Sequence, residues 1–287
     1  MDISIIIVSW KVRELLKKNL EAIYKSSGDV SFETIVVDNK STDGTFEMIS
    51  QEFPQVNLVL NNRNVGFAKA NNQAIEMAQG KYILLLNPDM QIFPDTLQNM
   101  FDFMERRTDA GVGSCKLVNE KGENIPHVRK FPKLLDQLAI VLKLPHVFPE
   151  VVDNYLMRDF DYDKEAEVDS VRGAFFMIRR EVIDAIGRLD ERYFVWFEEV
   201  DYCKRVINAG MKVVYTPSAK CIDYVGKSFS QVKKGRTQDY FRNSMLEYFS
   251  KWGSWFEFII LYLAWPIGKL MAVVAEIFGV EKEEDRK

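Results

Sequence analysis

Short apolar runs alternate with amphipathic stretches through the first 86 residues of the chain. The runs predict strands, which fall at residues 3–8, 32–37, 56–60 and 82–86. Helical spacing between them predicts helices at residues 12–24, from an N-cap at Thr42 through Ile49, and at 67–78. This βαβ order predicts an α/β, Rossmann-like fold, in which helices cover both faces of a mostly parallel, doubly wound sheet.

The run at residues 82–86 shows no alternation, which predicts a strand buried on both faces at the centre of the sheet. Pro88 cannot donate to a sheet ladder, so the strand ends there and presents Asn87 and Asp89 at its carboxyl end. Open α/β sheets bind their ligands at that edge. Asp89 can therefore hold a divalent cation together with substrate phosphates, unless Asn-Pro-Asp is only a turn.

The pattern beyond residue 90 is less regular. It predicts helices at residues 95–106, 181–186 and 198–209. It predicts strands at residues 112–118, 125–130, 171–178, 213–215 and 220–224. Residues 131–164 carry prolines and acids without a clear period, so we assign no element there. Gly173 allows close backbone approach within its strand.

Composition excludes several classes of protein. The net charge of −4 provides no general basic surface, which argues against a nucleic-acid partner. Three distant cysteines and two histidines form neither a disulfide framework nor a zinc pattern. The chain enters its first strand without a signal peptide, so we expect a cytoplasmic protein.

Polar side chains follow the first three predicted strands. Asp38 ends the second strand beside Ser9 and Trp10 at the end of the first, and its carboxylate can accept from a base N–H or a ribose hydroxyl. Trp10 can stack on a base. Asn64 and Gly66 precede a helix, where backbone N–H groups can approach an anion. The first strand lacks a following GxGxxG, which argues against an ordinary dinucleotide-binding fold.

Glu198, Glu199 and Asp201 open a predicted helix directly after the aromatic run at residues 193–197. The helix dipole alone favours acids there. The aromatic wall also lowers the local dielectric constant, which raises a carboxyl pKa towards use as a general base. Glu198 and Asp201 are three residues apart and are expected to share a helix face, with Glu199 pointing elsewhere.

The composition changes from Gly226 onwards. A basic stretch, hinged at Gly226 and Gly235, is either a lid that closes over a diphosphate or a solvated loop near anionic lipid; it contains Lys227, Lys233, Lys234 and Arg236. A helix is predicted at residues 239–252, and residues 281–287 read as a solvated tail.

Residues 255–280 are mostly apolar, but their longest uncharged run is eleven residues, 258–268, which is too short to span a bilayer. Trp252, Trp255, Tyr262 and Trp265 suit a membrane interface. We therefore favour amphipathic helices lying in the plane of the membrane surface. A helix packed in a core or a homodimer is the first alternative, and a true span is the second.

Taken as a set, four blocks resemble the family 2 glycosyltransferases of the GT-A fold, and most closely the rhamnosyltransferase-type members that build polysaccharides on lipid carriers. The blocks are residues 37–44, 64–71, 87–89 and 189–205. The resemblance covers about residues 1–250. It implies a catalytic domain at 1–230, with a nucleotide-binding half at about 1–110 and an acceptor-binding half at about 111–230. Residues 231–287 then form the basic loop and the membrane-associating or dimerising helices.

The resemblance implies inverting transfer of a sugar from a nucleotide donor. Asp38 would contact the nucleoside, with Ser9, Trp10, Asn64, Gly66 and Asn87 completing the nucleotide site. Asp89 would bind Mg²⁺ or Mn²⁺, and Glu199 would be the base that deprotonates the acceptor hydroxyl. Contacts to the acceptor or the diphosphate are expected from Gly173, Glu198, Asp201, Lys227 and Arg236.

Two residues depart from the family pattern. Glu199 stands where the family usually has Asp, so its carboxylate reaches one methylene further. Asp223 stands where the family commonly has a His, so we expect Asp223 to be a harder, negatively charged metal ligand.

The expected partners are a dTDP- or UDP-sugar donor, a polyprenyl-diphosphate-linked acceptor and the inner face of the cell membrane, with a homodimer as a further possibility. Two other classes remain open at this stage. A sugar-nucleotide nucleotidyltransferase normally has a glycine-rich loop after the first strand, which residues 9–13 lack. A non-catalytic scaffold that binds sugar nucleotide would have little use for the acids described above.

Overall fold

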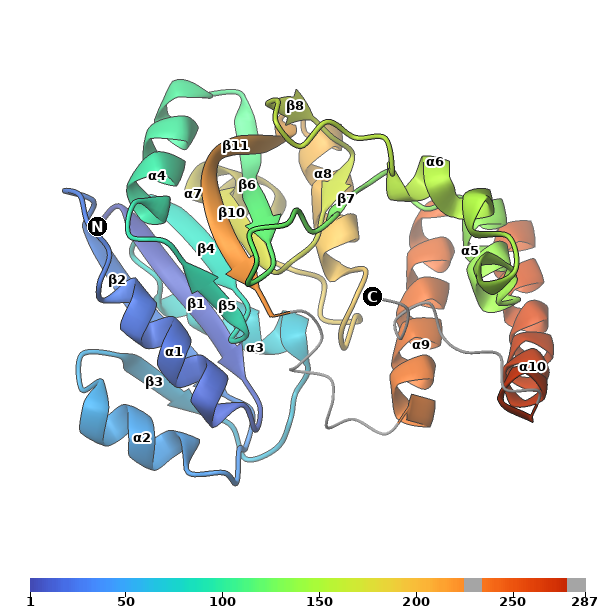
Figure 1. Cartoon of the computed structure of the whole chain (residues 1–287), viewed down its shortest axis with the longest axis horizontal. Helices are drawn as coiled ribbons and strands as arrows, with labels where there is room; N and C mark the ends of the chain where they lie inside the picture. Colours follow the sequence, from blue (N-terminus) through green and yellow to red (C-terminus); the bar gives the residue numbers. More distant parts are fainter. Residues whose placement is uncertain (225–233, 278–287) are drawn as a thin grey trace.

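A computed structural model describes residues 1–224 and 234–277 of the chain. Figure 1 shows a twisted sheet with helices on both faces and a further group of helices to one side. We call that group, α5 (Leu134–Val141), α9 (Lys234–Trp252) and α10 (Trp255–Ile277), the helical layer.

The main sheet has nine strands in the described part of the chain, in the order β3-β2-β1-β4-β10-β6-β11-β5, with β8 paired to β11. The strands are β1 (Ile3–Ser9), β2 (Phe32–Asp38), β3 (Asn57–Leu60), β4 (Tyr82–Leu86), β5 (Met90–Ile92), β6 (Ala110–Val118), β8 (Ala166–Glu167), β10 (Phe175–Arg179) and β11 (Lys212–Asp223). The first four are parallel, as predicted, whereas β10 runs antiparallel to both β4 and β6. We call the edge where β1, β2 and β4 end the site edge.

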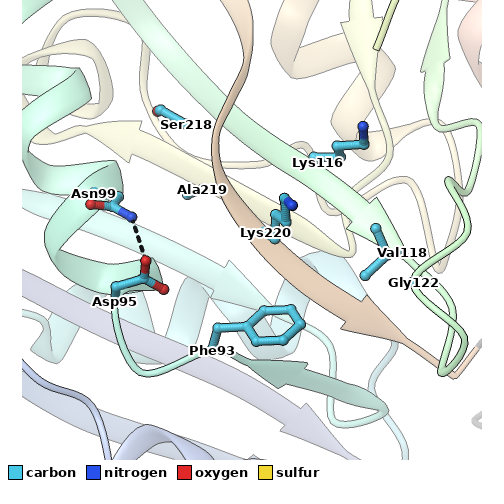
Figure 2. Close-up of a pocket in the computed structure, with 9 residues that line it drawn as sticks. All are labelled: Phe93, Asp95, Asn99, Lys116, Val118, Gly122, Ser218, Ala219 and Lys220. Atoms are coloured by element: carbon cyan, nitrogen blue, oxygen red, sulfur yellow. Dashed lines mark hydrogen bonds between the residues drawn. The ribbon is translucent and has the colours of Figure 1, made fainter. Parts of the chain in front are cut away.

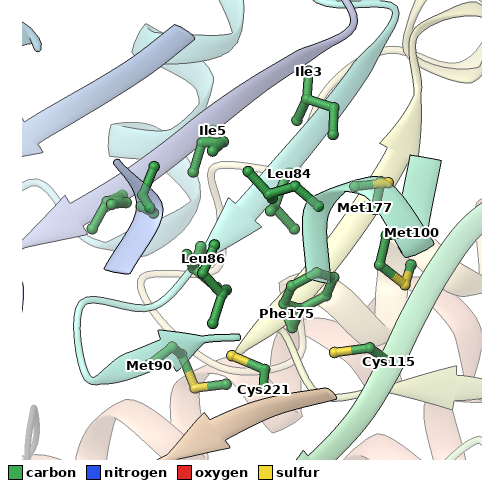
Figure 3. Close-up of a cluster of buried hydrophobic side chains, with 14 of the residues drawn as sticks. Ile3, Ile5, Leu84, Leu86, Met90, Met100, Cys115, Phe175, Met177 and Cys221 are labelled. Carbon is green, nitrogen blue, oxygen red and sulfur yellow. The ribbon is translucent and has the colours of Figure 1, made fainter. Parts of the chain in front are cut away.

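Alternation along the central strands divides the core into two clusters. Ile3 and Ile5 face the helices α1 (Arg13–Ile23), α2 (Thr45–Glu52) and α4 (Thr96–Arg106), as Figure 3 shows in part. Ile6 faces α3 (Phe67–Met77), α7 (Arg180–Ile186) and α8 (Glu198–Asn208) on the other side. All five residues of β4 are buried, which confirms the central strand expected from its unbroken apolar run.

Several predicted boundaries were wrong, each for a local reason. The helix α2 starts at Thr45 rather than after Thr42, because the Asp43 carboxylate accepts from the Thr45 hydroxyl and N–H at 2.6 and 3.3 Å. The predicted strands at 213–215 and 220–224 are one strand, β11, whose register shifts between Thr216 and Lys220, around Pro217. The short strand β5 was missed.

The predicted strands at 125–130 and 171–178 are also shorter than expected. The residues that pair as strands form β7 (Val128–Arg129) and β9 (Ser170–Val171), which are antiparallel and make a separate ribbon, and β10, which joins the main sheet. The unassigned residues 131–164 contain α5, the 3₁₀ turns η1 (Leu144–His146) and η2 (Pro149–Val152), and α6 (Asp153–Leu156).

A third core cluster joins the helical layer to the start of α8. Phe197 packs there with Phe249 of α9 and with Leu261 and Trp265 of α10. A Cβ atom at Gly268 would lie 2.1 Å from the Val141 carbonyl oxygen, so only glycine allows α5 and α10 to approach this closely.

The start of α9 corrects two expectations about the basic stretch. The helix begins at Lys234 rather than at residue 239, so Gly235 lies inside a helix and does not act as a hinge. Gly226, Lys227 and Lys233 lie outside the described residues.

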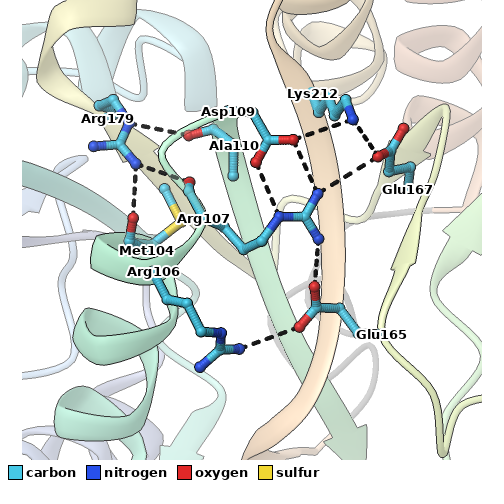
Figure 4. A network of polar contacts seen from close by, with 9 residues as sticks. All are labelled: Met104, Arg106, Arg107, Asp109, Ala110, Glu165, Glu167, Arg179 and Lys212. Carbon is cyan, nitrogen blue, oxygen red and sulfur yellow. Dashed lines mark hydrogen bonds and ion pairs between the residues drawn. The ribbon is translucent and has the colours of Figure 1, made fainter.

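Polar contacts join the sheet to α4 at the edge opposite the site edge (Figure 4). The buried Arg179 guanidinium donates to the carbonyl oxygens of Met104, Arg107 and Ala110 at 2.7, 3.1 and 3.1 Å. Arg107 in turn pairs with Asp109 and Glu165. We assign this network to stability, because its members already satisfy one another.

Candidate active site

Asp38 and Ser9 lie on adjacent strands in register at the site edge. Asp38 is 4% exposed, and its Oδ2 accepts from the Ser41 N–H at 3.0 Å. Asp38 Oδ1 and Ser9 Oγ are both buried and have no hydrogen-bond partner in the described part of the chain. Burial raises the pKa of Asp38. Two buried polar atoms without partners at neighbouring strand ends suit a ligand that hydrogen-bonds to them. Trp10, half-buried, follows Ser9.

The loop at Asn64 and Gly66 differs from the expected anion site. The Gly66 N–H donates to Asn64 Oδ1 at 2.9 Å, and the Phe67 N–H donates to the Phe194 carbonyl at 2.6 Å. A Cβ at Gly66 would lie 2.6 Å from the same carbonyl oxygen, and φ at Gly66 is 90°. The chain itself uses both N–H groups, so Gly66 serves the packing of α3 against the aromatic run.

Asp89 and Asp223 lie on neighbouring backbone segments at the other end of the site edge. The register between β5 and β11 pairs Asp223 with Met90, and the Tyr224 N–H donates to the Asp89 carbonyl at 3.1 Å. Both aspartates are buried, with 4% and 3% exposure. Arg172 Nη1 lies 3.2 Å from Asp223 Oδ2.

The donor set fits a divalent cation only in part. Within residues 1–224 and 234–277, three or more His, Cys, Asp or Glu side chains nowhere gather to hold a metal by themselves. Mg²⁺, however, is usually held by one or two carboxylates, with substrate phosphates and water completing the shell. Asp89 and Asp223 match that arrangement.

Asn87 connects this corner to Glu199. Its N–H donates to the Ala174 carbonyl at 3.0 Å, and its own carbonyl accepts from Asn19 Nδ2 at 2.8 Å. A Cβ at Gly173, next to Ala174, would lie 3.6 Å from Glu199 Cβ. The segment at Gly173 and Ala174 therefore contacts both the end of β4 and the start of α8. Asn19, fully buried on α1, is a positioning residue that the sequence did not reveal.

At the start of α8, Glu198 is buried and Glu199 is half-buried with its Oε2 atom enclosed. Burial raises the pKa of both, and the charge of Glu199 raises that of Glu198 further. Their Oε2 atoms have no hydrogen-bond partner among the residues that the structure describes. The preceding Trp196 and Phe197 both have φ of 66°, a left-handed conformation that costs about 1–3 kcal/mol in a residue other than glycine. Packing of Phe197 against the helical layer holds this turn.

Asp201 lies elsewhere. It is fully buried and accepts from Arg205 Nε at 2.9 Å and from Trp252 Nε1 at 2.7 Å, with Lys251 Nζ also at 2.7 Å. Asp201 therefore ties α8 to α9, whereas the Glu198 carboxyl lies near the charge of Glu199. The neighbours of Asp201 on α9 could not be read from local spacing.

The comparison with known proteins identifies the family. Residues 4–187, more than half of the chain, match the family model "Glycosyl transferase family 2". The chain belongs to this family and is a glycosyltransferase. The sugar-nucleotide nucleotidyltransferase and the non-catalytic scaffold are thereby set aside.

Two proteins with similar sequences are rhamnosyltransferases, so this glycosyltransferase is rhamnosyltransferase-like. The N-acetylglucosaminyl-diphospho-decaprenol L-rhamnosyltransferase of Mycobacterium tuberculosis is 29% identical over 206 residues, covering 68% of this chain and 67% of that protein. The rhamnosyltransferase WbbL of Escherichia coli is 28% identical over 228 residues, covering 77% and 82%. The mannosyltransferase PcManGT from Pyrobaculum calidifontis, solved with GDP-Man and Mn²⁺, superposes with a TM-score of 0.61 at 18% identity, covering 96% of this chain and 75% of that one. Its likeness supports the GT-A fold.

Two candidate residues, Arg236 and Lys227, come from the basic stretch. Arg236 is exposed near the start of α9, one turn before Tyr240, which stacks on Phe194 with ring centroids 4.5 Å apart. That contact brings the start of α9 beside the loop at Gly66. Lys227 lies outside the described residues.

A separate pocket of about 390 Å³ lies beside α4 and contains none of the candidate residues (Figure 2). Its lining includes Lys116, Lys220 and a single carboxylate, Asp95, which already accepts from Asn99 Nδ2 at 3.0 Å. This pocket therefore does not carry the chemistry of the glycosyltransferase.

Sequence reasoning missed two further residues at the site. Arg172 directly precedes Gly173 and pairs with Asp223, which its position in the sequence alone did not suggest. Asn72 of α3 holds the loop before the aromatic run, donating to the Leu189 carbonyl at 2.9 Å and accepting from the Leu189 N–H at 3.1 Å. The available signal was the pair of asparagines, Asn71 and Asn72, in a helix whose other buried positions are apolar.

Proposed function

We propose that this glycosyltransferase moves a sugar, with rhamnose as the first candidate, from a dTDP- or UDP-sugar to a hydroxyl of a lipid-linked saccharide with inversion. The observation that carries the proposal is the arrangement at the site edge. Two buried aspartates, Asp89 and Asp223, lie on neighbouring backbone segments at one corner, and the end of β4 and Glu199 contact the same short segment at Gly173.

The proposed roles follow from these positions. Asp38 and Ser9 accept from and donate to the nucleoside through their unpartnered oxygens. Asp89 and Asp223 would hold Mg²⁺ or Mn²⁺, whose charge stabilises the departing diphosphate. Glu199 takes the proton of the acceptor hydroxyl through Oε2, because burial keeps its pKa above that of an ordinary carboxyl. Attack opposite the leaving diphosphate inverts the anomeric centre.

Relatives support the finer parts of the proposal. The solved PcManGT complex holds Mn²⁺ and GDP-Man, which favours a divalent cation here without deciding between Mg²⁺ and Mn²⁺. The name of the mycobacterial relative specifies a diphospho-decaprenol acceptor, which favours a polyprenyl-diphosphate-linked acceptor for this chain.

The outer side of α10 supports contact with a membrane surface. Within the described residues, no helix has the length and apolar character needed to cross a bilayer. Up to residue 271, the exposed side chains of α10 are nevertheless almost all apolar; we call them the apolar face, and they are Trp255, Phe256, Ile259, Tyr262, Leu263, Ile267, Leu270 and Met271. Their spacing places them on one side of the helix. We infer peripheral binding to the inner membrane surface through this face.

The side of α10 opposite the apolar face packs in a core, as the alternative prediction for this segment expected. Leu261, Ala264 and Trp265 are buried against α5 and α9, so Trp265 cannot be a membrane anchor. A homodimer through the apolar face is the competing outcome of the membrane test described in the Discussion.

A thermal-shift screen of dTDP- and UDP-sugars, with and without Mn²⁺, tests the proposed donor and cation. We expect stabilisation by one nucleotide sugar only when the cation is present, and release of its nucleoside diphosphate when a polyprenyl-diphosphate-linked saccharide is added. Asp89→Ala should abolish both effects. Cation-independent turnover, or full activity of Asp89→Ala, would contradict the metal site.

A further inference from the structure

The ribbon of β7 and β9 places two arginines on the same side. Val128 pairs with Val171, and both are buried in the core. Their neighbours Arg129 and Arg172 therefore extend from the opposite face, because side chains alternate along a strand. The Arg172 N–H also donates to the His127 carbonyl at 3.0 Å, which continues the pairing beyond the ribbon.

Arg129 carries a positive charge that no carboxylate balances within the described chain. Its guanidinium donates to the carbonyl oxygens of Val128 at 2.8 Å and Pro126 at 3.4 Å. Burial lowers the pKa of Arg129, and the charges of Arg172 and Arg158 lower it further. Arg172 pairs with Asp223, and Arg158 lies 2.8 Å from Asp153 Oδ1. A recessed guanidinium held only by carbonyls keeps N–H donors for an anion.

Tyr155 of α6 lies next to this arginine, because its carbonyl accepts from the N–H of Lys130 at 3.0 Å. Burial raises the pKa of Tyr155 to about 12, and the charge of Glu199 acts in the same direction, so the hydroxyl stays a donor at neutral pH. The Gln137 side chain of α5 lies beside it, fully buried, and neither its oxygen nor its nitrogen has a hydrogen bond of ordinary geometry to a described residue. Unsatisfied polar groups are rare in a protein interior and suit a ligand.

We propose that Arg129, together with Arg172 and Tyr155, forms an anion subsite that binds a phosphate group of the lipid-linked acceptor. The proposal rests on the function proposed above and adds the feature that recognises its acceptor. A planar guanidinium can bind two phosphate oxygens at once, which fixes orientation as well as affinity.

The order of groups along the molecule favours the acceptor over the donor as the source of the phosphate. The nucleoside candidates Asp38 and Ser9 lie on β2 and β1, Asp89 follows β4, and Glu199 lies beyond β4 next to Gly173. The arginine ribbon comes next, with the Lys130 N–H after β7 bonded to the Tyr155 carbonyl of α6, and α5 packs on α10. In a lipid-linked saccharide the diphosphate stands between the attacked sugar and the lipid. The subsite likewise lies between Glu199, which would contact the attacked sugar, and the apolar face, which would contact the lipid.

Binding of geranyl diphosphate and of geraniol, measured by calorimetry without divalent cations, tests the subsite without requiring catalysis. We expect Arg129→Gln to weaken binding of geranyl diphosphate about tenfold or more, as expected for loss of charge-assisted hydrogen bonds, and to leave geraniol unaffected. Arg106→Gln is the matched control, because it removes one arginine whose side chain is 59% exposed at the opposite edge of the sheet. Equal affinity of wild type and Arg129→Gln would overturn the proposal.

Kinetics separate the two sources of phosphate. We expect Arg129→Gln to raise the KM for a diphosphate-linked acceptor about tenfold and to leave the KM for the donor unchanged. A raised donor KM with an unchanged acceptor KM would overturn the assignment to the acceptor. Arg129→Lys keeps the charge and loses the planar fork, so it should fold and bind with intermediate affinity even if Arg129→Gln does not fold. Failure of the proposed function would appear separately, as no turnover by the wild type with any donor.

Discussion

The site edge and the apolar face are opposite departures from the usual distribution of side chains. At the site edge, carboxyl groups that normally face water are buried and keep an oxygen without a hydrogen-bond partner among the described residues, as at Asp38 and Glu198. On the apolar face, side chains that normally avoid water are exposed, with Trp255, Leu263 and Leu270 at 75%, 62% and 65%. Each arrangement costs free energy in the isolated chain. Both are explained if a ligand completes the first surface and a membrane the second.

The rest of the molecule shows what a completed surface looks like. Asp201 is as buried as any candidate, yet three donors satisfy it. Phe46 of α2 and Leu60 of β3 are single exposed apolar side chains, whereas those on α10 share one side. Burial of a charge, or exposure of an apolar group, is therefore informative only when its neighbours leave it unsatisfied.

Replacing Glu199 should have the largest effect, because it removes the proposed base. We expect Glu199→Gln to lower kcat by roughly 10²–10⁴-fold with little change in Tm. In the wild type, the acid limb of kcat/KM should lie above the ordinary glutamate pKa of 4.5, since the carboxyl must be deprotonated to act and burial raises its pKa. Glu47→Gln, at an exposed position on α2, is the control. A loss of less than threefold in Glu199→Gln would assign the proton transfer to another group.

Asp201 is a buried acid of the same helix, and replacing it should reduce the stability of the protein. Asp201→Asn should lower the free energy of unfolding by about 3 kcal/mol, because Arg205 and Lys251 lose a buried partner. Urea denaturation measures the change. Asp239→Asn is the matched control, because it breaks the 3.0 Å ion pair between Asp239 and Lys269, whose side chains are 54% and 50% exposed, respectively. It should lower the free energy of unfolding by less than about 1 kcal/mol. Equal effects of the two changes would show that Asp201 does not hold α8 to α9.

Removing the apolar face should separate membrane binding from folding. We expect the triple change Phe256→Ser, Leu263→Ser and Leu270→Ser to weaken binding to phosphatidylglycerol vesicles by roughly 1,000-fold or more, since each large side chain contributes about 1.5 kcal/mol or more when buried. Tm should not fall. Sedimentation with vesicles measures the binding. Phe46→Ser and Leu60→Ser, at similarly exposed positions of the sheet domain, should have no effect. Unchanged vesicle binding together with a halved molar mass would favour the homodimer.

The sequence predicted the first half of the fold well, because each of its elements is buried in a way that leaves a simple period. The strand β4 reads as an unbroken apolar run, and α1 and α3 each show one apolar stripe. The segment at 131–164 could not be predicted, because its elements are only three to eight residues long and are too short to show a clear period. β11 was divided by the irregularity around Pro217.

The same limit applies to the candidate site. Asp38, Asp89 and Glu198 could be singled out because strand ends and helix starts are visible in the sequence. The roles of Asp201 and Arg172 depend on partners 51 residues away along the chain, Trp252 and Asp223. Nothing in local spacing predicts such pairs. Arg129 became a candidate only when the pairing of β7 with β9 placed it beside Arg172.

The smallest expected effect concerns Glu198, which tests whether the site edge is strained in the isolated chain. Burial, with the Glu199 charge, raises the pKa of Glu198 well above 4.5, so the folded state favours the protonated form. The carboxyl contributes most to stability below its unfolded pKa, and that contribution is lost as pH rises through the folded pKa. Glu198→Gln removes the penalty of a buried charge. It should therefore raise Tm by a few degrees at pH 8 and by progressively less as the pH falls towards 4.

Melting curves across this range measure the difference, with Glu47→Gln as the exposed control. A Tm gain that is constant with pH would mean that the buried charge is not its cause, and the contrast between the site edge and a satisfied core acid such as Asp201 would then rest on geometry alone.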